Sequence, residues 1–262
     1  AAIPLDASRA AEASVPAPGV AVSTRGLSFG YRRTLPVLRG LDFTAPKGGI
    51  TMVLGASGSG KTTLLKLIKG LLRPSAGEMT VLGATYSAHD RRSLAPDVAY
   101  VPQGLGLVRN LTVLENALIG CLGRLPLRHR LLGGFPQHLI DEAEERLTRI
   151  GLGRKLHDKA YNLSGGERQR VAIIRNRMQN PQLILADEFV SQLDPITQTQ
   201  IMTVVRERTR SDGVTYIQTT HELDLVPRFA DYVCVIRGGV KVLDAPVAGA
   251  SVAELERALR GG

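Results

Sequence analysis

The chain has 262 residues and a formal net charge of +9 at pH 7. This length is enough for one large domain or two small ones with a full hydrophobic core. No apolar run approaches the about 20 residues that cross a bilayer, which argues against an integral membrane protein. Residues 1–20 are rich in Ala and Pro and lack the charged-then-apolar order of a secretion signal, so we expect a disordered tail there.

The positive charge permits contact with nucleic acid or an anionic membrane, and a solvated basic surface is at least as good an interpretation. No aromatic residues interleave with the basic clusters to form a platform on which bases could stack. These clusters are Arg124, Arg128, His129 and Arg130, and Arg168, Arg170, Arg175 and Arg177.

The first structured part of the chain reads as short strands. Residues 21–47 alternate apolar and polar side chains between glycine turn signals, which predicts antiparallel strands. Tyr31, at a strand end, could stack on an adenine ring, although such a tyrosine more often belongs to the surface or the core.

A strand, a glycine-rich loop and a helix follow at residues 50–69. The apolar run Ile50–Leu54 predicts a buried strand, and the residues after the loop have helical spacing. The loop Gly55-Ala56-Ser57-Gly58-Ser59-Gly60-Lys61-Thr62 fits the P-loop pattern, in which backbone N–H groups surround phosphate oxygens. Lys61 would reach the β- and γ-phosphates and the Thr62 hydroxyl would ligate Mg²⁺. This context favours phosphate binding over an incidental turn.

Two further strands are predicted at Met79–Leu82 and Val98–Val101. Pro102 and Gly104 then end the second of these strands and leave Gln103 on a flexible loop. Its amide could contact Mg²⁺ or the attacking water, although it could also be an ordinary loop glutamine.

Residues 105–160 turn helical. Thr112 and Glu115 have the spacing of a capping box, and Asp141–Ile150 forms a charged amphipathic pattern. Ser164 and Glu167 repeat the capping-box spacing and start a helix that Pro181 stops.

The helix that begins at Ser164 offers a second anion site, because Gly165 and Gly166 leave its first N–H groups open to close approach. One chain cannot easily bring this site and the P-loop onto one phosphate, whereas a second copy of the chain could.

Carboxylates and a histidine follow two predicted strands in the last third of the chain. Leu183–Ala186 reads as a buried strand that would deliver Asp187 to a metal, and Glu188, one residue further out, could accept a proton from water or orient it. Paired carboxylates are often only surface charges, but their place at the end of an apolar strand in a P-loop chain favours the functional interpretation. Val214–Thr219 is a strand that leads to His221, which is placed to contact a γ-phosphate if the strand lies beside the P-loop strand. The remaining predicted elements are a helix from Pro195 to about Ser211, strands Tyr232–Ile236 and Val240–Leu243, and a helix Val252–Arg260.

Taken together, these motifs resemble the ATP-binding-cassette ATPases over roughly residues 20–245. The resemblance rests on the P-loop, Gln103, Leu163-Ser164-Gly165-Gly166-Glu167, Leu183–Glu188, Leu193-Asp194 and His221, in the order and spacing of that family. It implies an α/β fold: a P-loop NTPase (RecA-like) core with an antiparallel β subdomain, and an inserted helical subdomain. The implied parts are a tail at 1–20, the core at 21–103 and 179–246, the helical subdomain at 104–178, and a tail or helix at 247–262.

The resemblance also assigns roles for ATP and Mg²⁺. It implies a head-to-tail homodimer in which Ser164, Gly165 and Gly166 of one subunit complete the ATP site of the other. Glu188 would be the catalytic base, His221 would sense the γ-phosphate, and Gln103 would link the site to a membrane partner. The other nucleotide contacts would be Tyr31, residues 55–62, Thr63 and Asp194, and the metal contacts would be Thr62, Gln103 and Asp187.

Within the family, three segments resemble the ATPase subunit of phosphonate or phosphite importers: residues 107–116, 123–126 and 131–136. This implies integral-membrane permease partners, a solute-binding protein that acts indirectly, a place on the cytoplasmic face of the membrane, and no nucleic-acid partner. The alternatives are the ATPase of another transporter or of a release or cell-division complex, an accessory cassette of phosphonate breakdown, and a nucleic-acid-acting cassette.

The sequence departs from the family pattern at several positions. Phe189 stands where proline is usual, Ser191-Gln192 replaces a small pair at the expected dimer interface, and Arg175 and Arg177 lie on a helix stretch that is usually rich in alanine. These departures remove no catalytic group, but the coupling between subunits depends on how they are accommodated.

Overall fold

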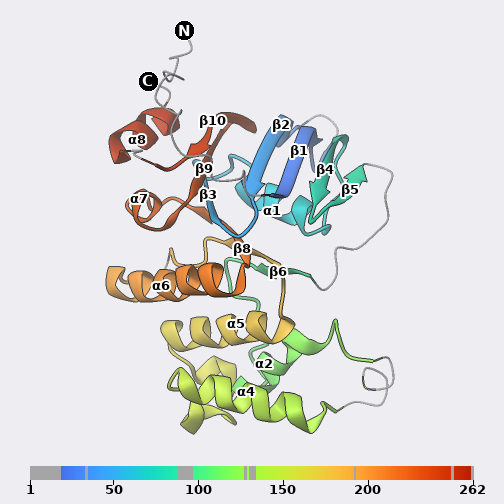
Figure 1. Cartoon of the computed structure of the whole chain (residues 1–262), viewed down its shortest axis with the longest axis vertical. Helices are drawn as coiled ribbons and strands as arrows, with labels where there is room; N and C mark the ends of the chain where they lie inside the picture. The colour runs from blue at the N-terminus through green and yellow to red at the C-terminus, as the bar shows by residue number, and fades with distance from the viewer. Residues whose placement is uncertain are drawn as a thin grey trace.

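The computed structural model describes residues 19–32, 35–87, 97–126, 129, 134–191, 193–248 and 251–260. Two sheets lie side by side in one half of the molecule, and a group of helices forms the other half (Figure 1). The predicted tail therefore falls almost entirely outside the described residues.

The first sheet is antiparallel throughout and has the order β2-β1-β4-β5. This confirms the strands predicted from the alternation in residues 21–47. β5 was not predicted, because four residues without a buried side chain give no readable alternation. The strands are β1 Val20–Phe29, β2 Leu38–Pro46, β4 Ala76–Val81 and β5 Ala84–Ser87.

The second sheet has the order β10-β9-β3-β8-β7-β6 and is parallel except for the edge strand β10. In a parallel sheet the carboxyl ends of neighbouring strands meet at one edge, where ligands bind. The ends of β3, β7 and β8 therefore lie together. The strands are β3 Ile50–Leu54, β6 Val98–Val101, β7 Leu183–Asp187, β8 Thr215–Thr220, β9 Tyr232–Arg237 and β10 Val240–Pro246.

Most helices lie within a few residues of their predicted positions. Both predicted capping boxes are confirmed, at Thr112–Glu115 and at Ser164–Glu167. The helices are α1 Lys61–Ile68, α2 Val113–Leu118, α4 Gln137–Arg149, α5 Gly165–Gln179, α6 Pro195–Asp212, α7 Leu225–Phe229 and α8 Val252–Arg260, with short 3-10 turns η2 Ile119–Cys121, η3 Gly153–Lys155 and η4 Ala160–Asn162. Among the helices of the described residues, none has both the length and the apolar composition to cross a bilayer.

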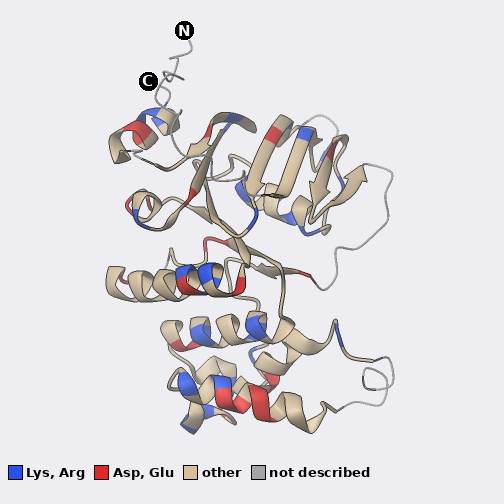
Figure 2. Cartoon of the chain, viewed as in Figure 1, with Lys and Arg blue, Asp and Glu red and all other residues tan. Residues whose placement is uncertain are grey.

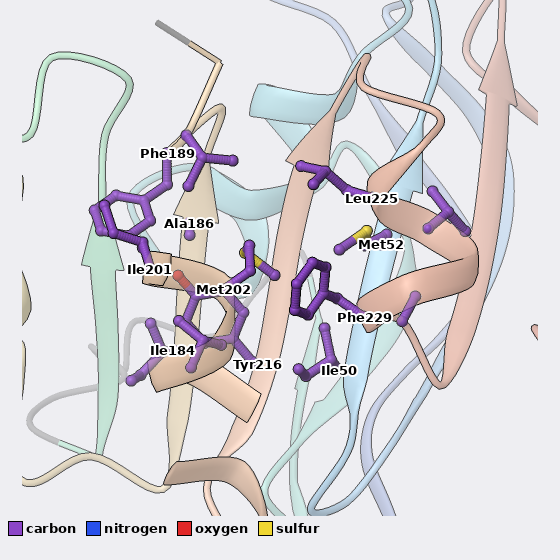
Figure 3. Close-up of a cluster of buried hydrophobic side chains, with 14 of the residues drawn as sticks. Ile50, Met52, Ile184, Ala186, Phe189, Ile201, Met202, Tyr216, Leu225 and Phe229 are labelled. Atoms are coloured by element: carbon purple, nitrogen blue, oxygen red, sulfur yellow. The ribbon is translucent and has the colours of Figure 1, made fainter. Parts of the chain in front are cut away.

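The parallel sheet is buried on both faces. On one face Ile50, Met52 and Tyr216 pack with Met202 of α6 and Phe229 of α7 (Figure 3). On the other face a second cluster joins the sheet to α1 and the antiparallel sheet. Strands covered on both faces read as continuous apolar runs, which is why β3 and β7 were predicted from such runs.

A third hydrophobic cluster unites α2, α4 and α5, with Val113, Leu147 and Val171 fully buried. Because these helices share their own core, we propose that residues 104–178 form the helical subdomain.

The basic clusters are partly used inside the fold. Lys and Arg lie on α4, α5 and α6, with acidic residues among them on α4 (Figure 2). Arg124 forms an ion pair with Asp97 at 3.0 Å and donates to the Asn180 carbonyl, and Arg168 donates to the Leu163 carbonyl. Arg128 and Arg130 lie outside the described residues. Several of these guanidinium groups therefore serve the fold itself.

Candidate active site

The loop between β3 and α1 is shaped by glycines. Gly58 and Gly60 have φ values of 78° and 105°, in the left-handed region that favours glycine. A Cβ at Gly60 would lie 2.6 Å from Leu38 Cδ2, and one at Gly55 would lie 2.3 Å from the Ile236 carbonyl oxygen. Only glycine fits at these close approaches.

The same loop has the features of a phosphate site. No side chain caps the N-terminus of α1, so its first N–H groups remain available to an anion. The Ser59 hydroxyl is buried, and it has no hydrogen-bond partner within the described part of the chain. An oxyanion with several acceptor oxygens would satisfy both sets of donors.

Lys61 is the first residue of α1, and its side chain is folded back over the loop. Its Nζ donates to the carbonyls of Gly55 at 2.7 Å and Ala56 at 3.2 Å, and lies 3.9 Å from Glu188 Oε1. Burial lowers the pKa of Lys61, while the nearby carboxylates Glu188 and Asp187 oppose that shift. The ammonium group therefore stands between the phosphate loop and the acidic pair.

Asp187 ends β7 and is almost completely buried. Its Oδ1 accepts hydrogen bonds from the hydroxyls of Thr62 at 3.0 Å and Thr219 at 2.8 Å. Tyr100 donates to Oδ2 at 3.4 Å, and burial, followed by the Asp187 charge, raises the pKa of Tyr100. A hydroxyl and a carboxylate side by side are the hard oxygen ligands that Mg²⁺ prefers, so the residues present fit that ion.

Glu188 lies where the side chains from four segments converge. Its Oε2 accepts from Gln103 Nε2 at 2.9 Å, and its Oε1 lies 3.9 Å from Lys61 Nζ and 4.0 Å from His221 Nδ1. His221 follows β8, which lies beside β3 as predicted. The structure thus brings the predicted Gln103, Lys61, Glu188 and His221 together.

The backbone of Glu188 is strained. Its φ of 46° lies in the left-handed region, which costs a non-glycine residue about 1–3 kcal/mol. Hydrogen bonds hold it there: its N–H donates to Thr219 Oγ1 at 2.9 Å, and its carbonyl accepts from Ser191 Oγ at 2.9 Å. A conformation fixed against strain points to a functional position.

Comparison with known proteins decides the family. Residues 38–191 match the ABC transporter family. The chain belongs to the ABC transporter family. Among its curated relatives, "Phosphonates import ATP-binding protein PhnC" of Thiobacillus denitrificans is 37% identical over 90% of this chain and 91% of the relative. The protein of the same name from Hyphomonas neptunium is 39% identical over 82% of each chain.

Solved ABC cassettes share the fold. A nucleotide-free ATP-binding cassette from an ABC transporter superposes with a TM-score of 0.75 at 25% identity, covering 92% of this chain and 95% of that one. A dimeric cassette in a post-hydrolysis state with ADP and phosphate gives 0.74 at 28% identity, covering 87% of this chain and 100% of that one. The predicted α/β P-loop NTPase fold is confirmed, and the chain is an ATPase of this family.

The ABC signature segment starts α5. Ser164 caps the helix by accepting from Glu167 N, while Glu167 accepts from Ser164 N and from Lys155 Nζ at 2.7 Å. The hydrogen bond from Lys155 and those from Ser164 lower the pKa of Glu167 to about 2. A Cβ at Gly165 would meet nothing within 4 Å, so this helix end is open to another surface.

Other predicted nucleotide contacts lie at separate places. The Tyr31 ring is exposed and packs edge-on against Phe29, with ring centroids 5.0 Å apart. Asp194 caps α6 by accepting from Ile196 N and Thr197 N, and these hydrogen bonds lower its pKa. The structure shows no contact between either residue and the group around Glu188. Gln192 lies outside the described residues.

Two of the departures from the family pattern have a structural account. Phe189 is buried beside Ile201 in the core of the sheet (Figure 3), and its carbonyl accepts a hydrogen bond from Gln169 of α5. Arg175 donates to two loop carbonyls. Nothing in the structure explains Arg177.

Thr219 was missed by sequence reasoning, although it joins both acidic residues. Replacing it by valine should lower the free energy of unfolding by about 1–3 kcal/mol, because the Glu188 N–H would lose its acceptor. ATP hydrolysis should fall as well, since Asp187 would lose a donor. Urea denaturation and phosphate release measure the two effects.

Thr51→Val is the matched control, because the Thr51 hydroxyl is buried in β3 with no hydrogen-bond partner within the described part of the chain. Its removal should be neutral or stabilising. Equal stability of the Thr219→Val variant and the parent would contradict the structural role of Thr219.

Proposed function

We propose that the chain is the ATP-hydrolysing subunit of an importer for phosphonate or phosphite. The observation that supports ATP hydrolysis is the position of the Glu188 carboxylate, which lies between the side chains of Lys61, Gln103 and His221. The substrate class rests on relatives named for phosphonate import, which are 37% and 39% identical over most of both chains.

In the proposed reaction, ATP lies with its phosphates on the loop Gly55–Thr62 and near Lys61. Glu188 takes a proton from a water molecule as the water oxygen attacks the γ-phosphorus. The bond between the γ-phosphorus and the bridging oxygen breaks, and ADP leaves with the electron pair. His221, 4.0 Å from Glu188 Oε1, would contact the γ-phosphate.

Mg²⁺ would be held by the oxygens of Thr62 and Asp187, with Gln103 as a further contact. The ion would neutralise charge on the phosphate oxygens. The Thr219 and Tyr100 hydroxyls donate to the Asp187 carboxylate and hold it beside the Thr62 hydroxyl.

A head-to-tail homodimer supplies the second half of each site. Ser164 is exposed at the start of α5, and Gly165 has open space around it. This anion-binding helix end would meet the ATP held by the P-loop of the other subunit. Tyr31 would stack on the adenine, and Thr63 and Asp194 would complete the contacts.

The permease would bind the helical subdomain from the cytoplasmic face of the membrane, and a solute-binding protein would act through the permease. The loop that carries part of the resemblance, residues 107–112, is folded around the buried Asn116. The Asn116 side-chain amide accepts a hydrogen bond from the Val108 N–H and donates hydrogen bonds to the carbonyls of Val108, Leu111 and Thr112. Val108 itself is exposed, as a docking residue must be.

Uptake of labelled methylphosphonate into vesicles tests the proposal. Vesicles that hold this chain, its permease and its binding protein should accumulate label only with ATP, and Glu188→Gln should abolish the uptake. Glu207→Gln is the control, since Glu207 is exposed on α6 and away from the site. ATP hydrolysis without uptake of phosphonate or phosphite would assign the chain to a transporter of another solute.

A further inference from the structure

Arg175 lies within α5 and reaches out to the loop that carries Gln103. Its Nη1 donates to the Gly106 carbonyl at 2.7 Å and its Nη2 to the Leu105 carbonyl at 2.5 Å. No ion pair links it to a carboxylate within the described part of the chain, and burial lowers its pKa. The guanidinium group, which is only partly exposed, thus holds two backbone carbonyls of the loop.

The loop needs such support because of its shape. Leu105 and Gly106 have φ values of 63° and 61°, so two successive residues are left-handed. A left-handed conformation is unfavourable for a residue such as leucine, whose Cβ comes too close to the following carbonyl oxygen. The Leu105 N–H closes a turn onto the Pro102 carbonyl at 2.7 Å, with Gln103 inside that turn. The fork of one arginine can bond both carbonyls, which a single ammonium cannot do with the same geometry.

The backbone of α5 at Arg175 is fixed by close packing. A Cβ at Gly120 of η2 would lie 2.0 Å from the Arg175 carbonyl oxygen, so α5 and η2 are in direct backbone contact. The same helix donates from Gln169 to the carbonyl of Phe189, the residue after Glu188. α5 therefore contacts both the Glu188 turn and the loop whose Gln103 bonds Glu188 at 2.9 Å.

We propose that Arg175 is a positioning residue for hydrolysis, which sets Gln103 against Glu188 by holding the Leu105 and Gly106 carbonyls. It thereby links the helix that begins at Ser164 to the carboxylate in the same subunit. This inference rests on the proposed role of Glu188.

The test compares ATP hydrolysis by full-length variants. Arg175→Gln should lower kcat about tenfold, as expected for losing hydrogen bonds to a charged group, and should change the KM for ATP less than about twofold. Arg175→Lys should be intermediate. Arg177→Gln is the control, since Arg177 is exposed on the same helix and should keep the parent kcat.

A double-mutant cycle identifies the route of the effect. In a Gln103→Ala background, adding Arg175→Gln should change kcat by less than about twofold, because residues acting through one contact are not additive. An equal tenfold loss in both backgrounds, or a parent kcat for Arg175→Gln, would overturn the proposal. A separate measurement tests the role of Glu188 itself: if the Glu188→Gln variant hydrolyses ATP at the parent rate, Glu188 is not the base.

Discussion

Replacing Glu188 by glutamine should lower ATP hydrolysis by at least about a hundredfold while ATP binding is retained, since a positioned general base contributes about 10²–10⁴-fold. The amide has the shape of the carboxylate but cannot take the proton of water. The P-loop and Lys61 remain, so the nucleotide should still bind. The ATP-bound dimer should persist because its ATP is not hydrolysed.

Phosphate release, binding of a fluorescent ATP analogue and size-exclusion chromatography with ATP measure these three effects. Glu207→Gln, on the exposed side of α6, should match the parent in all of them. If Glu188→Gln hydrolyses ATP near the parent rate, Glu188 is not the base.

Ser164→Arg should lower ATP hydrolysis at least about tenfold and leave nucleotide binding to the monomer intact. The bulky cation would stand where the open end of α5 must approach the other subunit's ATP, and loss of an oxyanion contact alone commonly costs about 10²-fold or more. ATP hydrolysis and the ATP-dependent shift to a dimer are the measurements.

The chain offers a matched control for this substitution. Ser251 and Glu254 form the same reciprocal cap before α8, far from the signature segment in Figure 1. Ser251→Arg should lose a cap, worth about 0.5–2 kcal/mol of stability, and keep the parent hydrolysis rate. An unchanged rate in Ser164→Arg would refute the proposal that ATP is bound between two subunits.

Much of the fold could be predicted because its signals are local. The buried strand before the P-loop, the capping box at Ser164 and the helix Val252–Arg260 each follow from short patterns. α4 begins at Gln137, four positions before its predicted start at Asp141, and Pro136 is its N-cap residue. The short α7 gave no periodic signal, since five residues barely exceed one turn.

The site was predictable in its residue types and less so in its contacts. A carboxylate after an apolar strand indicated Asp187 and Glu188. Thr219 looked like any threonine of a strand, because its hydrogen bonds to both residues come from the register of β7 with β8. Arg175 seemed out of place on its helix for a similar reason: its two acceptors lie about 70 positions earlier in the chain.

The position of β3 in its sheet governs when the ATP site can form during synthesis. β3 pairs with β8 and β9, with Ile50 opposite Tyr216 and Thr51 opposite Tyr232. The antiparallel sheet of β1, β2, β4 and β5 is complete by Ser87, whereas β8 and β9, the two neighbours of the P-loop strand, begin only at Thr215 and Tyr232. Such long-range parallel pairings form slowly. A nascent chain that stops before residue 215 therefore carries an intact P-loop motif without the strands that hold it, and gains its nucleotide site only once β8 and β9 have been made.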